Sequence, residues 1–355
     1  MSTTSDQTRP GLPRGVLLLV GLAAAVVVIA GMRAAADILA PAFFALILTV
    51  LAHPLRRWLN RWMPSWASSA VCIATVYLGI VLLALALVVS AARFAALLPE
   101  YTDEFHKRVD DAVAWLSDAG VDQKQIDAVA SSFDLGQLGG FIADLLGELL
   151  GLVSNLFFIF ALVLFMTVDG SSFPRQLERA RGYKPAIVDS IDDFAHGTRR
   201  YLGVSTVFGL IVAVLDSIAL ALLGVPLPLL WGLLAFITNY IPNIGFIIGL
   251  IPPAILALLE GGPSLMLAVI AVYCVLNVVI QSVIQPKVVG DAVGLSTTLS
   301  FFSLVFWTWV IGPLGALLAI PLTLFTKAVL VDADPTTRWV RPLISNKDEP
   351  EDSPA

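Results

Sequence analysis

The sequence predicts an all-α polytopic integral membrane protein, and three observations support this prediction. Of the 355 residues, 58% are hydrophobic and only 14% are charged, with a mean hydropathy of +0.87. Soluble domains carry about a quarter charged residues, so this composition excludes a water-soluble fold. Several apolar stretches reach the roughly 20 residues that a helix needs to cross a bilayer. Two longer apolar stretches are broken by proline and glycine.

Six apolar stretches have the length of a simple span, namely residues 12–32, 34–52, 67–98, 151–168, 201–223 and 264–284. The stretches 229–259 and 297–330 are too long for one simple span. The sequence therefore predicts about eight membrane segments. The first apolar run follows Arg9 and Arg14, as in a signal peptide, but many spans come after it. We expect it to be retained as the first helix.

The distribution of basic residues predicts the orientation, because cytoplasmic loops are enriched in Lys and Arg. Residues 53–66 hold three arginines and no acid, and residues 169–202 hold six basic residues, so both segments should face the cytoplasm. Residues 99–150 hold eleven acids and three bases, so they should lie on the other side. Both termini are then cytoplasmic.

This orientation divides the chain into six parts. We expect a three-span region at 1–98, an extracytoplasmic helical insertion at 99–150 and a fourth span at 151–168. A cytoplasmic amphipathic helical segment at 169–202 precedes a transport core at 203–331 and a disordered cytoplasmic tail at 332–355.

The two water-facing segments carry apolar residues at helical spacing, such as Phe105 and Val109 in one and Ile187 and Ile191 in the other. The acids of the insertion form either a vestibule that attracts cations or a solvated helical face. The cytoplasmic segment should lie against the membrane surface or dock on the bundle.

The two overlong stretches resemble each other. IPNIGFIIGLIP begins at Ile241, and IGPLGALLAIP begins at Ile311. In each, a proline precedes a glycine at the break, and an Ile-Pro pair follows. Residues 229–241 would reach only about 20 Å as a helix, less than the roughly 30 Å of the hydrocarbon core. We favour two re-entrant hairpins that enter from opposite faces, which suits alternating access. Two kinked full-length spans are the alternative.

The first break carries polar residues deep in an apolar stretch. Pro242 has no N–H, so within a helix the Thr238 carbonyl would lose its partner. Lipid cannot satisfy such a group, and broken helices persist only where protein or a water-filled cavity meets them. Together with Asn239, Asn243 and Gly245, this break is a candidate binding site for a small polar solute or a monovalent cation. Packing alone is the competing interpretation.

The span 264–284 places a polar stripe on one helical face. Tyr273, Asn277, Gln281 and Gln285 follow one another at intervals of four residues. Burying an unpaired amide costs roughly 2 kcal/mol or more, so the stripe should face water, a polar partner or a solute. Hydrogen bonding between helices is the alternative explanation.

Asp216 is the one acid well inside a predicted span. Intramembrane carboxylates are expensive and often functional, so Asp216 is the candidate for ion or proton coupling. A solvated structural role near the outer end of its helix is the alternative. The three histidines are scattered and the chain has no Walker loop, so neither a metal triad nor ATP hydrolysis is expected. We expect no enzyme activity, no cofactor and no nucleic-acid partner.

These motifs resemble those of the AI-2E transporter family, also called the autoinducer-2 exporter or PerM-like permease family. The resemblance includes ALVLFMTVDG from Ala161, VIQPKVVGDAVGLS from Val283 and GPLGALLAIPL from Gly312. It implies a bacterial inner-membrane permease that moves small solutes without ATP. Some members are associated with exporting autoinducer-2 and others with sodium or lithium/proton antiport. Members are thought to form homo-oligomers, plausibly pentamers.

The resemblance also implies particular residues. The signature glycine and proline positions of the family are here Pro242, Asn243, Gly245, Pro286, Gly290, Gly315 and Pro321. We expect Pro252, Pro286, Gly290, Gly315 and Pro321 to act as hinges or structural elements. Relatives often have an acid and an asparagine where this chain has Gln281 and Ser282. That difference leaves Asp216 as the main candidate for coupling.

Three functions compete. The first is ATP-independent export of a small polar solute, such as an autoinducer-2-like signal, by alternating access. The second is Na⁺(Li⁺)/H⁺ antiport centred on Asp216. The third, which involves no transport, is a cell-envelope scaffold that presents its acidic insertion to a partner.

Overall fold

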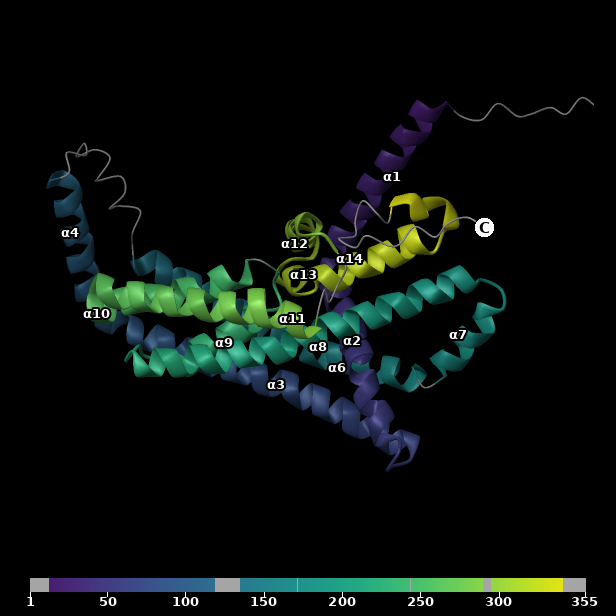
Figure 1. Cartoon of the computed structure of the whole chain (residues 1–355), viewed down its shortest axis with the longest axis horizontal. Helices are drawn as coiled ribbons and strands as arrows, with labels where there is room; N and C mark the ends of the chain where they lie inside the picture. The colour runs from purple at the N-terminus through teal and green to yellow at the C-terminus, as the bar shows by residue number, and fades with distance from the viewer. Residues whose placement is uncertain (1–12, 119–134, 171, 243, 290–294, 341–355) are drawn as a thin grey trace, which may run out of the picture.

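The computed structural model describes residues 13–118, 135–170, 172–242, 244–289 and 295–340. The regular secondary structure of this part is helical, and the prediction of an all-α polytopic membrane protein is confirmed (Figure 1). Asn243, Gly290, part of the insertion and most of the tail lie outside the described residues.

The N-terminal region consists of α1 (Arg14–Ala34), α2 (Ala36–Leu59) and α3 (Ser65–Leu97). The last two pack against α6 (Leu135–Asp169) through a buried apolar cluster, whose members include Ala45, Ile73, Ile159 and Val163. The helix α6 begins well before residue 151. The predicted boundary between insertion and fourth span therefore does not coincide with the end of a helix.

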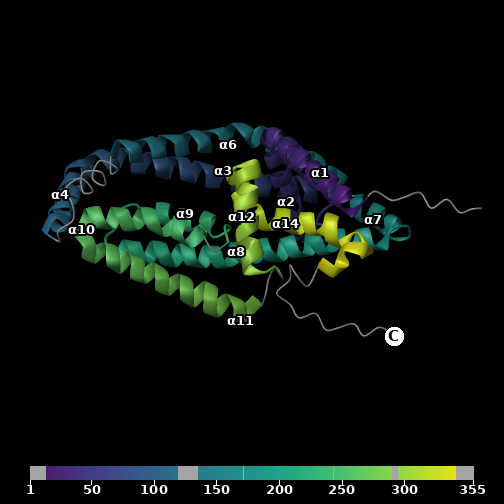
Figure 2. The same ribbon diagram turned by 90° about the horizontal axis from the view of Figure 1, so that it is seen from above.

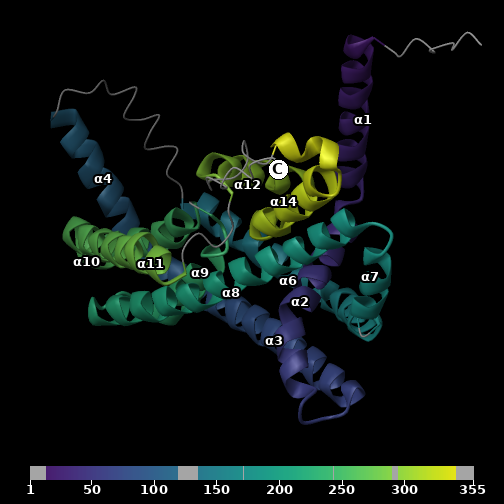
Figure 3. The ribbon, with the colours of Figure 1, turned by 45° about the vertical axis from the view of Figure 1, so that its right-hand side comes forward.

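The described part of the insertion contains η1 (Leu98–Tyr101) and the amphipathic helix α4 (Thr102–Asp118). In Figures 1 and 3, α4 projects from the end of the molecule opposite α7 (Phe173–Arg181). At that end the Tyr101 hydroxyl donates to Glu260 Oε2 at 2.6 Å, which connects the insertion to α10 (Gly245–Asn277).

The core is built on α8 (Pro185–Leu222), a single helix that crosses the predicted boundary at residue 202. Antiparallel to it runs α9 (Pro228–Thr238), and the first limb of α10 returns along α9. The direction of α10 changes at Gly262, which has φ +75°. Figure 2 shows the second limb running back toward the turn between α9 and α10. The first overlong stretch is therefore a helical hairpin, and its re-entrant placement in the membrane stays a prediction.

The second limb of α10 continues through the π-helix η2 (Val278–Ile284) into α11 (Gln285–Val289). The second overlong stretch then comprises α12 (Thr297–Ile311), α13 (Pro313–Leu317), α14 (Ala319–Lys327), the π-helix η3 (Ala328–Asp332) and η4 (Pro335–Val340).

The second stretch also breaks at glycine, since Gly312 has φ +75°. Its two limbs, α12 and α14, do not run alongside each other as in a hairpin. Instead, α12 crosses α14 and α8 at a steep angle (Figures 1 and 2). Ser303 of α12 donates to the Ala319 carbonyl at 2.9 Å. Residues of both breaks, among them Ile241 and Leu314, pack against one shared apolar cluster.

By length and composition, four helices of the described chain are able to cross a membrane. They are Ala36–Leu59, Ser65–Asp111, Pro185–Leu222 and Gly245–Val288. A fifth results if Asn155–Asp169 and Phe173–Arg181, which bend by 56°, count as one broken span. Three shorter apolar helices accompany them. This count does not confirm the expected number of about eight segments.

Candidate functional site

The described residues of the turn between α9 and α10 are joined by backbone hydrogen bonds. The sequence predicts an unpaired Thr238 carbonyl because Pro242 lacks an N–H. This prediction is wrong, since Ile241 N donates to the Thr238 carbonyl at 2.8 Å. Ile244 N then donates to the Pro242 carbonyl at 2.7 Å, and Gly245 N donates to the Ile241 carbonyl at 3.1 Å. The break is thus a compact turn, and its Thr238 carbonyl is not a free ligand for a solute.

Three of the predicted amide side chains meet beside this turn. Gln281 Nε2 donates to Asn239 Oδ1 at 2.9 Å and to Asn277 Oδ1 at 2.8 Å. Asn239 Nδ2 donates to the Ser205 carbonyl, and Asn277 Nδ2 donates to the Tyr273 carbonyl, each at 2.9 Å. Both amide hydrogens of Gln281 are used inside the protein. The network fastens the hairpin tip to α8 and to the second limb of α10.

The π-helix η2 affects which residues of the polar stripe line the cavity. Tyr273, Asn277 and Gln281 face the same cavity, as the four-residue spacing predicts. Gln285, the fourth member, is absent from the cavity lining. A π-helix widens the turn to i→i+5 hydrogen bonds, so the face rotates between Gln281 and Gln285. π-Helical turns of this kind are frequent at functional sites.

Asp216 is fully buried, and Tyr273 is 1% exposed. Neither carboxylate oxygen of Asp216 nor the Tyr273 hydroxyl has a hydrogen-bond partner among the described residues. A buried carboxylate that stays charged without a partner carries a desolvation penalty of several kcal/mol. Within the described residues Asp216 is therefore left without a partner, in contrast to the amides, which are joined to one another.

A small cavity joins these groups. Its volume is about 10 Å³, which accommodates about one water molecule. Its lining comes from α8, α9, both limbs of α10 and η2: Val212, Asp216, Ala235, Thr238, Asn239, Phe246, Gly249, Tyr273, Asn277 and Gln281. The candidate coupling residue and three of the candidate solute-binding residues thus share one site.

The other predicted residues that the structure describes are not among those that line the cavity. Pro242 forms the turn, and buried Gly245 packs against Thr238. Pro252 is half-buried in the first limb of α10, and Pro286 is exposed in α11. Gly315 and Pro321 are buried in α13 and α14, within the second broken stretch. Asn243 and Gly290 lie outside the described residues, so their roles stay predictions.

Several lining residues were not predicted from the sequence. Val212, Ala235 and Gly249 each lie four residues from a predicted residue, namely Asp216, Asn239 and Gly245. Residues four apart share a helical face. This spacing is the signal that would have found the apolar wall of the cavity.

Comparison with known proteins agrees with this architecture. The family described as "AI-2E family transporter" matches residues 22–333 of the chain. The chain belongs to the AI-2E transporter family. The "AI-2 transport protein TqsA" of Escherichia coli (strain K12) is 32% identical, with 89% of this chain and 92% of that protein aligned.

Other relatives of the AI-2E family cover the chain to a similar extent. The "Putative transport protein YhhT" of Escherichia coli (strain K12) is 30% identical over 88% of this chain and 90% of its own length. A "Putative transport protein" of Haemophilus influenzae is 29% identical over 90% and 94%. The protein is therefore a multi-pass membrane transporter of this family.

Proposed function

We propose that this AI-2E family member exports a small polar solute without ATP, by alternating access around the hairpin formed by α9 and the first limb of α10. It acts in a bacterial inner membrane with both termini in the cytoplasm. The name of one relative, an AI-2 transport protein, makes autoinducer-2 the first solute to test. The structure then represents a closed state of the transporter. The cavity that contains Asp216 has a volume of about 10 Å³, which is too small for such a solute.

The observation that carries the proposal is that the unpartnered, fully buried carboxylate of Asp216 shares one cavity with the amide side chains that hold the hairpin tip. Broken helices at mid-membrane are a recurring substrate site in transporters. Here the amide network holds the tip closed, and solute entry requires that Gln281 release Asn239 and Asn277. Binding or loss of a proton or cation at Asp216 supplies the free-energy difference between the two states.

Purified protein in liposomes tests the role of the amide network. Gln281→Leu removes the hydrogen bond to Asn239, which joins the hairpin tip to the second limb of α10, and the hydrogen bond to Asn277 within that limb, each worth about 1 kcal/mol net. We expect autoinducer-2 flux to change by about tenfold or more. Gln285→Leu is the matched control, since it alters the next amide along the helix outside the cavity. If both variants transport like the unmodified protein, the amides are structural and the proposed solute site is wrong.

The second candidate function is Na⁺(Li⁺)/H⁺ antiport, which the one-water cavity beside Asp216 favours, because a dehydrated monovalent cation is of similar size. In everted vesicles, added Na⁺ should then reverse an imposed pH gradient, and Asp216→Asn should abolish this recovery. Asp37→Asn, at the exposed start of α2, is the control. Recovery that persists in Asp216→Asn, or is absent in the unmodified protein, removes antiport through this residue.

A further inference from the structure

The helix α7 has an apolar face that the described protein covers only in part, since Leu177 is half-buried and Phe173 and Ala180 are exposed. Phe173, Leu177 and Ala180 lie at spacings of four and three residues, so they share one side of the helix. No residue of α7 is buried, and Phe173 is 50% exposed. Just beyond the helix, Tyr183 is 87% exposed. A helix docked on the bundle by its whole apolar face would bury these side chains, so α7 is not docked in that way.

The position of α7 indicates that its exposed apolar side chains lie close to the membrane. The apolar helix Asn155–Asp169 bends by 56° into α7, so α7 begins where a membrane segment ends. Arg56 Nη1 donates to the Thr167 carbonyl at 3.1 Å, which fixes the end of α2 beside the same point. The turn after α2 carries Trp62, which is 78% exposed, and tryptophan is enriched at the membrane–water interface. Figure 1 shows α7 running across the end of α8 rather than along it.

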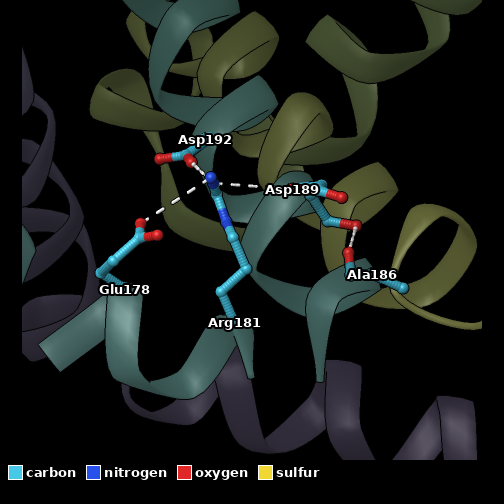
Figure 4. A network of polar contacts seen from close by, with 6 residues as sticks. Glu178, Arg181, Ala186, Asp189 and Asp192 are labelled. Carbon is cyan, nitrogen blue, oxygen red and sulfur yellow. Dashed lines mark hydrogen bonds and ion pairs between the residues drawn. The ribbon is translucent and has the colours of Figure 1, made fainter. Parts of the chain in front are cut away.

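The charges of α7 fall into two groups. Arg181 is neutralised within the protein, as Figure 4 shows: its guanidinium lies 2.6 Å from Asp192, 3.6 Å from Asp189 and 3.8 Å from Glu178. The contacts with Asp189 and Asp192 hold the C-terminal end of α7 on α8. By contrast, Arg175, Arg179 and Lys184 are exposed and form no ion pair with the described residues.

We propose that α7 is an interfacial anchor that binds the anionic phospholipid headgroups of the surrounding membrane. Phe173 and Tyr183 enter the boundary between headgroups and acyl chains, as the apolar side chains of interfacial helices do. Arg175 and Arg179 lie two residues from Phe173 and Leu177, off the apolar side of the helix, and reach lipid phosphates with their long side chains, as does Lys184 just beyond the helix. Arg181 is the tie that connects this lipid-bound helix to α8, whose other half carries Asp216.

Hydrogen–deuterium exchange of the full chain in nanodiscs tests this proposal without any transport assay. In the unmodified protein, adding phosphatidylglycerol to phosphatidylcholine discs should slow exchange of residues 173–184 by about fivefold or more, the factor that one surface cation contributes. The triple variant Arg175→Gln, Arg179→Gln and Lys184→Gln should lose this slowing. Its exchange over residues 201–222 should stay normal, which shows that the bundle is folded.

Two controls separate the lipid contact from general charge and from docking on α8. Lys107→Gln removes an exposed cation at the opposite end of the molecule and should keep the lipid effect. Arg181→Gln should speed exchange of α7 in both lipids and keep the lipid effect. Inorganic phosphate added to phosphatidylcholine discs should not reproduce the slowing. The proposal is overturned if exchange of 173–184 is the same in both lipids, or if the triple variant responds like the unmodified protein.

Discussion

At the scale of single residues, the two broken stretches share one kind of contact, that of a glycine with a backbone carbonyl oxygen. A Cβ added to Gly245 would lie 1.8 Å from the Thr238 carbonyl oxygen, and one added to Gly315 would lie 2.0 Å from the Trp307 carbonyl oxygen. In each broken stretch, therefore, a glycine lets one helix approach the carbonyl of the helix before it. This shared contact is a structural counterpart of the repeat seen in the sequence.

We predict that Gly245→Ala destabilises the protein, because the clash is with backbone that has to move. Overpacking of this kind costs about 1–3 kcal/mol. Thermal unfolding in detergent measures the effect. Gly203→Ala is the matched control on α8, because its Cβ would meet nothing within 4 Å. Equal melting temperatures for the two variants would show that the tight approach at the hairpin tip does not exist.

At the scale of elements, α8 serves as the platform on which the hairpin is placed. The Tyr201 hydroxyl of α8 donates to the Tyr240 carbonyl at 2.8 Å, and Thr206 of α8 lies 2.7 Å from the Tyr240 hydroxyl. Asn239 adds its hydrogen bond to the Ser205 carbonyl. Two consecutive turns of one helix thus hold the residues just before Pro242.

A cysteine pair tests this docking. A Cβ at Gly209 would lie 3.2 Å from the Asn239 Cβ, close to the roughly 3.5–4.5 Å of disulfides. In a background without Cys72 and Cys274, Gly209→Cys with Asn239→Cys should therefore cross-link rapidly on mild oxidation in membranes. Mass spectrometry measures the yield.

The pair Gly203→Cys with Asn239→Cys is the control for that experiment, because a Cβ at Gly203 would have no neighbour within 4 Å. It should remain reduced. Cross-linking of both pairs to the same extent would mean that the tip of α9 does not rest on α8 at Gly209.

A second joint between elements lies at the end of the molecule that carries α4. The Tyr101–Glu260 hydrogen bond precedes the bend at Gly262, where a Cβ would lie 3.4 Å from the Arg108 guanidinium. We predict that Tyr101→Phe frees α4 from α10 and speeds hydrogen exchange of residues 102–111 severalfold, since the hydrogen bond is charge-assisted. Tyr77→Phe is the control, because Tyr77 contacts a phenylalanine ring on α6. Unchanged exchange in Tyr101→Phe would mean that other contacts hold α4.

At the scale of the whole molecule, the two polar segments lie at opposite ends of the long axis. The acidic helix α4 lies at one end and the basic segment around α7 at the other (Figures 1 and 3). This separation agrees with the orientation predicted from the loops, in which basic segments remain in the cytoplasm.

Cysteine labelling tests that orientation. With Cys72 and Cys274 replaced, Lys107→Cys should react with a membrane-impermeant maleimide in intact spheroplasts, because Lys107 is 66% exposed on the predicted outer side. Tyr183→Cys should react only after the membrane is permeabilised. The reverse pattern would invert the topology and place α7 outside the cell.

The predictions from the sequence agree best with the structure for features that depend on local composition. Apolar length is a local property of the chain, so the membrane class, the amphipathic helix after residue 101 and the break at Pro242 were predictable. The expected count of about eight spans is not confirmed, because α10 runs through parts of two predicted segments and the described apolar helices Leu18–Ala34, Pro228–Thr238 and Thr297–Ile311 are shorter than a span. Helix length and crossing angle depend on packing partners that a hydropathy pattern does not contain.

The candidate polar residues could be identified from the amino-acid order alone: Asp216, Asn239, Asn277 and Gln281 stand out because each is costly in an apolar stretch. The folded arrangement was needed to show that the three amides satisfy one another and that Asp216 is left without a partner in the same cavity. This is so because hydrogen-bond satisfaction depends on distances between helices. Residues 42 apart along the chain, such as Asn239 and Gln281, meet only after the bend at Gly262 brings the second limb of α10 back to the hairpin tip.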